Sequence, residues 1–147
     1  MKKQSFLLVL AAFAVFFTAN AFAHCEIPCG IYDDKLRMKL IYEHAGTVER
    51  SMKKIVSLSS QNPANYNQIV RWVTNKEEHA NEIQHIVTQY FMTQRIKFNT
   101  KDYSKKLQAF HKILVYAMKC KQTTEISNVN SIRSAFKEFE KLYFGDK

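Results

Sequence analysis

The sequence predicts an all-α protein built as an antiparallel four-helix bundle. The 147-residue chain contains only three glycines and two prolines, which leaves few turn residues for a β-rich fold. Apolar residues recur at helical spacing in four segments. The connections between these segments are short, and short connections favour antiparallel neighbours in a bundle.

The first predicted helix spans roughly Asp33–Ser59. Its apolar stripe comprises Met38, Ile41, Ala45, Val48, Met52 and Ile55. Asn62-Pro63 then breaks the pattern, and proline favours an early position in the helix that follows. The second helix is predicted over roughly 64–93. Its stripe comprises Ile69, Val73, Ala80, Ile83, Val87 and Tyr90.

Residues 94–101 are mostly polar and are predicted to connect the second helix to a third, over roughly 102–121. The stripe of the third helix comprises Tyr103, Leu107, Phe110, Leu114 and Ala117. A fourth helix is predicted over roughly 127–143, and Gly145 lies just beyond its end, as is typical of helix C-termini. Its stripe comprises Ile132, Phe136, Phe139 and Tyr143. The predicted bundle occupies residues 33–147 as one domain.

Residues 1–23 have the pattern of a secretory signal peptide. Lys2 and Lys3 precede an apolar stretch, and the segment closes with the small residues Ala21 and Ala23 on either side of Phe22. The apolar stretch is too short and wrongly flanked for a membrane span. We therefore expect cleavage after Ala23, export to the periplasm or the exterior, and no membrane association of the processed chain.

Cleavage after Ala23 would make His24 the first residue of a short metal-binding peptide, the hook, over residues 24–32. The α-amine of His24 and the backbone nitrogen of Cys25 can close one chelate ring, and the thiolates of Cys25 and Cys29 supply two sulfur donors. Two nitrogens and two sulfurs suit a square plane, which favours Ni(II) or Cu(II) over the tetrahedral preference of zinc. The electron-rich donors indicate redox chemistry on a small substrate.

Two alternatives use the same residues without catalysis. In an exported protein, Cys25 and Cys29 could form a structural disulfide, or one of them could pair with Cys120. The chain would then be a secreted helical binding protein. A metal-delivery or storage protein would instead hold nickel or copper in the hook without turnover.

The start of the processed chain resembles the metal-binding hook of the nickel-containing superoxide dismutases. The matching residues are His24, Cys25, Pro28, Cys29, Gly30 and Tyr32. The resemblance continues more loosely through the helical body, including Lys76–Ala80 and the pair Tyr90-Phe91.

The resemblance implies a nickel-dependent enzyme that converts superoxide to dioxygen and hydrogen peroxide. Nickel would be bound by His24, Cys25 and Cys29, with the His24 imidazole in an axial position. Tyr32 would lie over the open face of the metal plane and screen access to it. The family also implies a homo-oligomer, a hexamer of bundles. An acidic partner of the axial imidazole would fall near Leu40–Glu43, and the position of an arginine partner either falls at His79 or is absent from this chain.

The chain is basic, with a formal net charge of +9 that falls to +7 when Lys2 and Lys3 leave with the signal peptide. A positive surface attracts a small anion such as superoxide. Solvated lysines such as the pair Lys105-Lys106 explain the charge equally well, and there is no nucleic-acid-binding motif. Glu82 and His85 have the spacing of a di-iron ligand pair, but a di-iron bundle needs two such pairs.

Overall fold

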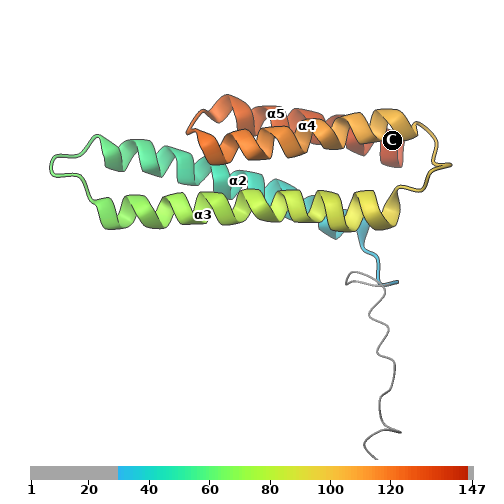
Figure 1. The fold of residues 1–147 in the computed structure, drawn as a ribbon, viewed down its shortest axis with the longest axis horizontal. Helices are drawn as coiled ribbons and strands as arrows, with labels where there is room; N and C mark the ends of the chain where they lie inside the picture. The colour runs from blue at the N-terminus through green and yellow to red at the C-terminus, as the bar shows by residue number, and fades with distance from the viewer. Residues whose placement is uncertain (1–29, 146–147) are drawn as a thin grey trace, which may run out of the picture.

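The computed structural model describes residues 30–145. Their helical segments are α2 (Asp34–Ser59), α3 (Tyr66–His85), the π-helix η1 (Ile86–Arg95), α4 (Tyr103–Gln122) and α5 (Ile126–Phe144). Because η1 continues directly from α3, these segments form four rods packed antiparallel to one another (Figure 1). The predicted antiparallel four-helix bundle is confirmed. The predicted signal peptide and most of the hook lie outside the described residues.

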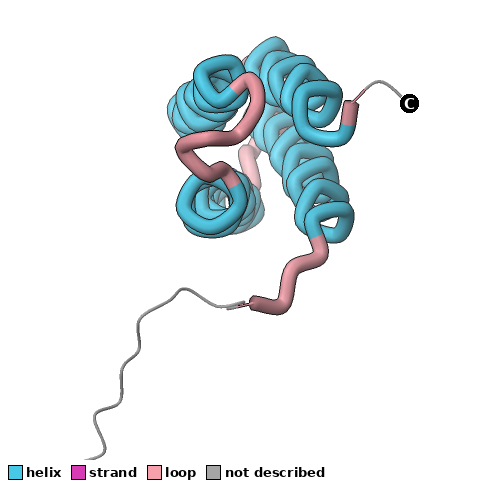
Figure 2. The backbone as a smooth tube through the Cα atoms, turned by 90° about the vertical axis from the view of Figure 1, so that its right-hand side faces the viewer, coloured by secondary structure: helices cyan, strands magenta, loops and turns pink. Residues whose placement is uncertain are grey.

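The bundle is made of two helical hairpins, one of α2 with α3 and the other of α4 with α5. Packing of α3 against α4 and of α2 against α5 closes the four-helix arrangement, as the end-on view shows (Figure 2). The first hairpin is longer and extends beyond the connection between α4 and α5 (Figure 1). Val56 and Ser57 still line a pocket with Thr124 and Ile126, and we call residues 58–73 beyond them the projecting arm. None of the described helices is long and apolar enough to span a membrane.

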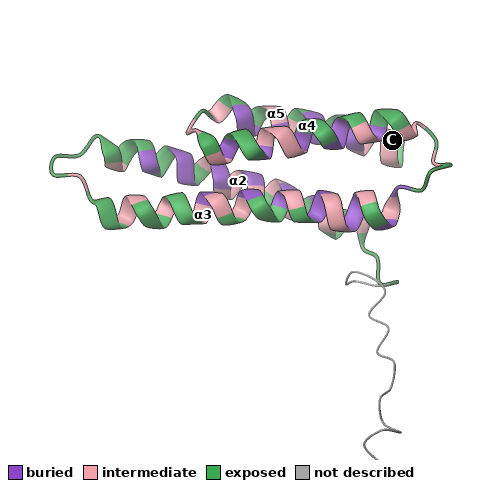
Figure 3. Ribbon diagram, in the orientation of Figure 1, coloured by how far each residue is buried: buried purple, intermediate pink, exposed green. Residues whose placement is uncertain are grey.

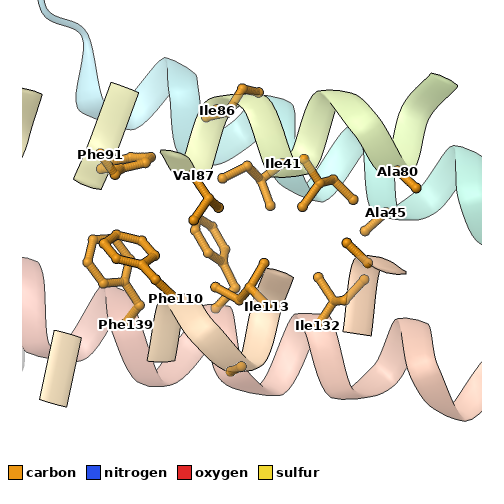
Figure 4. Close-up of a cluster of buried hydrophobic side chains, with 14 of the residues drawn as sticks. Ile41, Ala45, Ala80, Ile86, Val87, Phe91, Phe110, Ile113, Ile132 and Phe139 are labelled. Carbon is orange, nitrogen blue, oxygen red and sulfur yellow. The ribbon is translucent and has the colours of Figure 1, made fainter. Parts of the chain in front are cut away.

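A single apolar core runs between the four helices, with buried residues on their inward faces (Figure 3). All six residues of the predicted α2 stripe are buried, and so are Ile132, Phe136 and Phe139 of α5. Phe91, Phe110 and Phe139 pack together at the end of the bundle where η1 lies (Figure 4). Burial of each such aromatic side chain contributes about 2–3 kcal/mol to folding.

Two of the predicted stripes need correction. Val73 of α3 is 37% exposed, because this part of α3 belongs to the projecting arm and has no α4 or α5 beside it. In α4, Leu107 and Leu114 are only half-buried, whereas Ala109 and Ile113 are fully buried. Both predicted leucines therefore lie at the edge of the interface.

The helix boundaries agree with prediction except around α3. Asp33 caps α2 by accepting a hydrogen bond from the Leu36 amide at 2.9 Å. The second helix was predicted from 64 but begins at Tyr66, because the side chain of Asn65 provides the cap. Pro63 therefore precedes the helix and is not in its first turn. At the other end, helical structure continues to Arg95 as a π-helix.

Lysines at two buried positions also depart from the sequence interpretation. Lys106 was predicted on the surface, but it is only 5% exposed, and its ammonium lies 5.6 Å from the centroid of the Tyr143 ring. Lys76, 4% exposed, donates hydrogen bonds to the carbonyls of Cys120, Lys121 and Thr123 at the C-terminus of α4. These are carbonyls that the helix itself leaves without partners.

Candidate metal centre and its support

Of the predicted site residues, only Tyr32 is among those that the structure describes. His24, Cys25 and Cys29 lie outside the described range, so their arrangement stays a prediction. The described chain begins at Gly30, with a positive φ of 72° that suits glycine. It meets α2 at the end of the bundle where η1 and α5 finish (Figures 1 and 2).

The Tyr32 ring packs against two side chains of η1. The guanidinium carbon of Arg95 lies 4.2 Å from its centroid, within the range of a cation–π contact. The Tyr90 ring lies 5.9 Å away with an interplanar angle of 71°, an edge-to-face arrangement. Tyr32 itself stays 43% exposed, so it is held by the bundle while remaining open to solvent.

Asp34, the first residue of α2, holds these two η1 side chains in place. One carboxylate oxygen accepts hydrogen bonds from the Tyr90 hydroxyl at 2.7 Å and from Arg95 Nε at 2.8 Å. The other accepts from Arg95 Nη2 and from the Tyr143 hydroxyl, both at 2.8 Å. All four acceptor positions of the carboxylate are used. We call Asp34, Tyr90, Arg95 and Tyr143 the Asp34 network; it joins α2, η1 and α5.

The hydrogen bonds of the network stabilise a charged Asp34 and uncharged tyrosines. Burial raises the pKa of Asp34, but the hydrogen bonds from Arg95, Tyr90 and Tyr143 outweigh it, so the pKa is lowered and the carboxylate is stabilised. Burial, together with the bond to Asp34, raises the pKa of Tyr143 to about 12 and raises that of Tyr90 as well. Both phenols therefore remain protonated donors at neutral pH.

The π-helical geometry of η1 places Tyr90 and Arg95 on the same carboxylate. In an α-helix of 3.6 residues per turn, side chains five positions apart diverge by roughly 140° around the axis. In a π-helix the bonding runs from residue i+5 to residue i, so residues five apart are stacked neighbours. Tyr90 and Arg95 are separated by five residues, and both donate to the same oxygen of Asp34.

Arg37 adds a second guanidinium to this end of the bundle. It lies 5.2 Å from the centroid of the Tyr90 ring, and its Nε is buried without a hydrogen-bond partner among the described residues. The carboxylates of Asp33 and Asp34 lie at the same end, so the two guanidinium groups are balanced by two negative charges. Because Arg95 is paired with Asp34, Arg37 is the guanidinium that has no carboxylate partner among the described residues, and it favours the approach of an anion.

Sequence analysis did not identify Asp34, Arg95 or Arg37 as parts of the site. Arg95 falls in the segment that was predicted to be a connection, and Tyr143 was assigned only to the core stripe. The available signal was weak: an acidic residue immediately after a capping aspartate, close to the predicted metal peptide. The five-residue spacing of Tyr90 and Arg95 points to opposite faces unless a π-helix is assumed.

His79, the predicted position of an axial-partner arginine, is bound to another histidine. Its Nδ1 lies 2.8 Å from Nδ1 of His44, so one ring donates and the other accepts. Burial and the nearby charge of His79 lower the pKa of His44. Glu82 and His85 are both exposed. Over residues 30–145, no three His, Cys, Asp or Glu side chains converge in an arrangement that could hold a metal ion.

The described residues define the class of the protein as an all-helical, antiparallel four-helix bundle. The model of the nickel-containing superoxide dismutase family matches residues 19–147, and the chain belongs to that family. No curated protein and no solved structure gave a match.

Family membership indicates nickel-dependent superoxide dismutase activity, an oxidoreductase reaction with superoxide as substrate and nickel as cofactor. The predicted donor set fits that metal, because cleavage after Ala23 would supply an amine beside a backbone nitrogen and two thiolates, and these donors suit square-planar Ni(II). The matched range includes those residues.

Proposed function

We propose that nickel would be held by the α-amine of His24, the backbone nitrogen of Cys25 and the thiolates of Cys25 and Cys29, with the His24 imidazole as a further ligand. The observation that best supports this site is the position of Tyr32. It lies three residues after Cys29 and is packed between Arg95 and Tyr90 at the end of the bundle where the chain enters α2. The metal peptide is thereby joined to a fixed point.

Nickel held by these residues would supply the one-electron redox couple, Ni(II)/Ni(III), that disproportionation of superoxide requires. The chain's residues govern access and charge. The half-exposed Tyr32 ring screens the centre from larger molecules, and Arg37 attracts the anionic substrate. Water near the Tyr32 hydroxyl supplies the protons that leave in hydrogen peroxide.

The proposed coordination is tested by moving the amine. One alanine inserted between Ala23 and His24, retained after processing, displaces the α-amine by one residue and leaves both thiols in place. We expect nickel content, measured by elemental analysis, and superoxide dismutation to be lost while helical circular dichroism is unchanged. Full activity in that variant would refute the coordination. Wild-type protein that carries a Cys25–Cys29 disulfide and no nickel would favour the secreted binding protein.

We further propose that the chain is exported and cleaved after Ala23, because only a free His24 supplies the terminal amine. Support comes from the basic, apolar and small-residue pattern of residues 1–23. N-terminal sequencing of the protein recovered from the periplasm or the culture medium tests this proposal. A mature chain that begins elsewhere would contradict it.

The chain is also proposed to form a homo-oligomer, with a hexamer as the expectation from the family. The projecting arm provides a surface suited to contact between copies. Tyr66, Val70 and Val73 lie along one side of α3 with exposed fractions of 75%, 62% and 37%. Analytical ultracentrifugation of Val70→Lys should show smaller assemblies, and Lys137→Glu on an exposed part of α5 provides a control. An unchanged assembly would place the interface elsewhere.

A further inference from the structure

We propose that Arg95 is a positioning residue for the metal centre, which fixes the Tyr32 ring at the base of the hook through a contact that Asp34 enforces. The inference rests on the proposed role of Tyr32 as the screen over the metal. It identifies Arg95, 63 positions further along the chain, as the residue that holds Tyr32 in this role.

Arg95 is itself immobilised. Its Nε and Nη2 each donate to a different oxygen of Asp34 at 2.8 Å, a bidentate pairing that fixes both the position and the plane of the guanidinium. Its side chain is 27% exposed and that of Asp34 is 16% exposed, so solvent competes only partly for these bonds. One face of the fixed guanidinium remains available, and the Tyr32 ring occupies it at 4.2 Å.

The position of Asp34 is determined in turn by three helices. It begins α2, and it accepts hydrogen bonds from Tyr90 and Arg95 of η1 and from Tyr143 of α5. A carboxylate with four donors cannot turn without breaking at least one of them. The plane against which Tyr32 packs is therefore set by the folded bundle and not by the N-terminal peptide.

Arg95 supplies about half of the ring contacts that hold Tyr32. Gly30 has no side chain, and Ile31 is 78% exposed. The Tyr90 ring meets Tyr32 at 5.9 Å, an edge contact worth about 0.5–1.5 kcal/mol, which is comparable with a partly exposed cation–π contact. Without the guanidinium, the ring would keep only the edge contact and would sample more positions.

The first test observes the ring directly, without nickel or activity. The full chain is labelled with 3-fluorotyrosine, and the ¹⁹F resonance of Tyr32 is assigned by its absence in Tyr32→Phe. We expect Arg95→Met to move this resonance toward that of an exposed tyrosine. Arg133→Met is the matched control, because Arg133 forms an ion pair with Glu49 at 2.7 Å far from Tyr32 in the chain and is 35% exposed. An unmoved Tyr32 resonance in Arg95→Met would overturn the proposal.

The Arg95→Lys variant tests whether the shape or the charge of the Arg95 side chain positions Tyr32. Lysine keeps the positive charge but cannot pair with both carboxylate oxygens while presenting a flat face to the ring. We expect its Tyr32 resonance to move as in Arg95→Met. A spectrum identical to that of the wild type would show that charge alone suffices, and would also overturn the proposed geometry.

The second test is a double-mutant cycle in the nickel-loaded enzyme, with kcat/KM for superoxide measured by pulse radiolysis. Arg95→Met should lower kcat/KM by about tenfold at unchanged nickel content, because the screening group is misplaced. In the Tyr32→Leu background, the same change should have a smaller effect, since the group that Arg95 positions is gone. Independent effects of the two substitutions would contradict action through Tyr32. A further outcome is that Tyr32→Leu alone leaves kcat/KM unchanged, while Arg95→Met still moves the ¹⁹F resonance of Tyr32. The proposed screening function of Tyr32 would then fail, but the positioning of its ring by Arg95 would stand.

Discussion

The two ends of the bundle differ in the residues that form them: one is a hydrogen-bonded polar network and the other exposes apolar side chains. Where the hook joins α2, a carboxylate, an arginine and two tyrosines form the Asp34 network, packed on Phe91 and Phe139. At the other end, the projecting arm consists of two helices only and exposes Tyr66 and Val70.

This difference separates two requirements of a small metalloenzyme. A metal peptide needs a fixed attachment point, and directional hydrogen bonds between three helices provide one. A surface that meets another protein needs apolar area that remains accessible. Placing the two features at opposite ends allows either one to change without disturbing the other.

The largest expected effect comes from the hook itself. Cys29→Ser should abolish nickel binding and dismutation, because a serine hydroxyl does not replace a thiolate ligand. Cys120→Ala is the matched control. Cys120 is a free, buried thiol whose pKa burial raises to about 11, so it remains protonated and a poor metal ligand. Elemental analysis of both variants measures the contrast, and equal nickel loss would contradict the assigned ligands.

Next in size is loss of the Asp34 network. Asp34→Ala removes the acceptor for four hydrogen bonds and leaves Arg95 without its counter-ion, which should lower the free energy of unfolding by about 2–4 kcal/mol in urea titrations. The control is Glu138→Ala, in an exposed pair with Lys112 at 2.9 Å, where the loss should stay below about 1 kcal/mol. Similar losses at both sites would remove the distinction between the network and an ordinary surface pair.

Lys76 tests the boundary at which the projecting arm leaves the four-helix section. Lys76→Met keeps the apolar stem but leaves the carbonyls at the end of α4 without their donor, and should cost about 1–2 kcal/mol. Chemical denaturation measures this cost. Lys54→Met, on the exposed side of α2, is expected to change stability by less than about 0.5 kcal/mol. A Lys76 effect as small as this would show that the capping bonds are not needed.

The smallest effect is expected from the histidine pair, which lies between the two ends. Burial and His79 lower the pKa of His44 in the folded state, so the unfolded chain binds more protons over the window below about pH 6.5. Stability should therefore rise with pH across that window, by a small amount because solvent screens the partly exposed ring. His44→Gln should flatten this part of the profile, whereas His111→Gln, at an exposed position, should not. A profile unaffected by His44→Gln would contradict the origin assigned to it.

The fold was predictable because apolar spacing alone determines which faces meet. The α2 stripe from Met38 to Ile55 is buried throughout, as its helical period requires. Val73 was misassigned because its spacing is the same whether or not a neighbouring helix reaches that far. The burial of Lys106 was missed for a related reason, since only the folded structure places the Tyr143 ring beside it.

In the candidate site, too, one part could be predicted from the sequence and the other could not. The proposed ligand residues, His24, Cys25 and Cys29, lie close together in the chain, so their chemistry can be predicted from sequence. The residues that support Tyr32 could not be predicted in this way. Asp34, Arg95 and Tyr143 are distant in sequence and meet only through tertiary packing. Their types are common on helix surfaces, and nothing in their local pattern distinguishes them from solvated side chains.

The wide turn of η1 makes this protein tolerant of a change in chain length at one point. Deleting a single residue between Tyr90 and Arg95 would restore ordinary α-helical winding and bring the two residues to four positions apart, roughly 40° around the axis. Both donors would then remain on the side of the helix that faces Asp34. A one-residue deletion here should therefore be tolerated in evolution without replacement of the carboxylate at the start of α2, whereas the same deletion in an ordinary α-helical stretch would turn every following residue by roughly 100°.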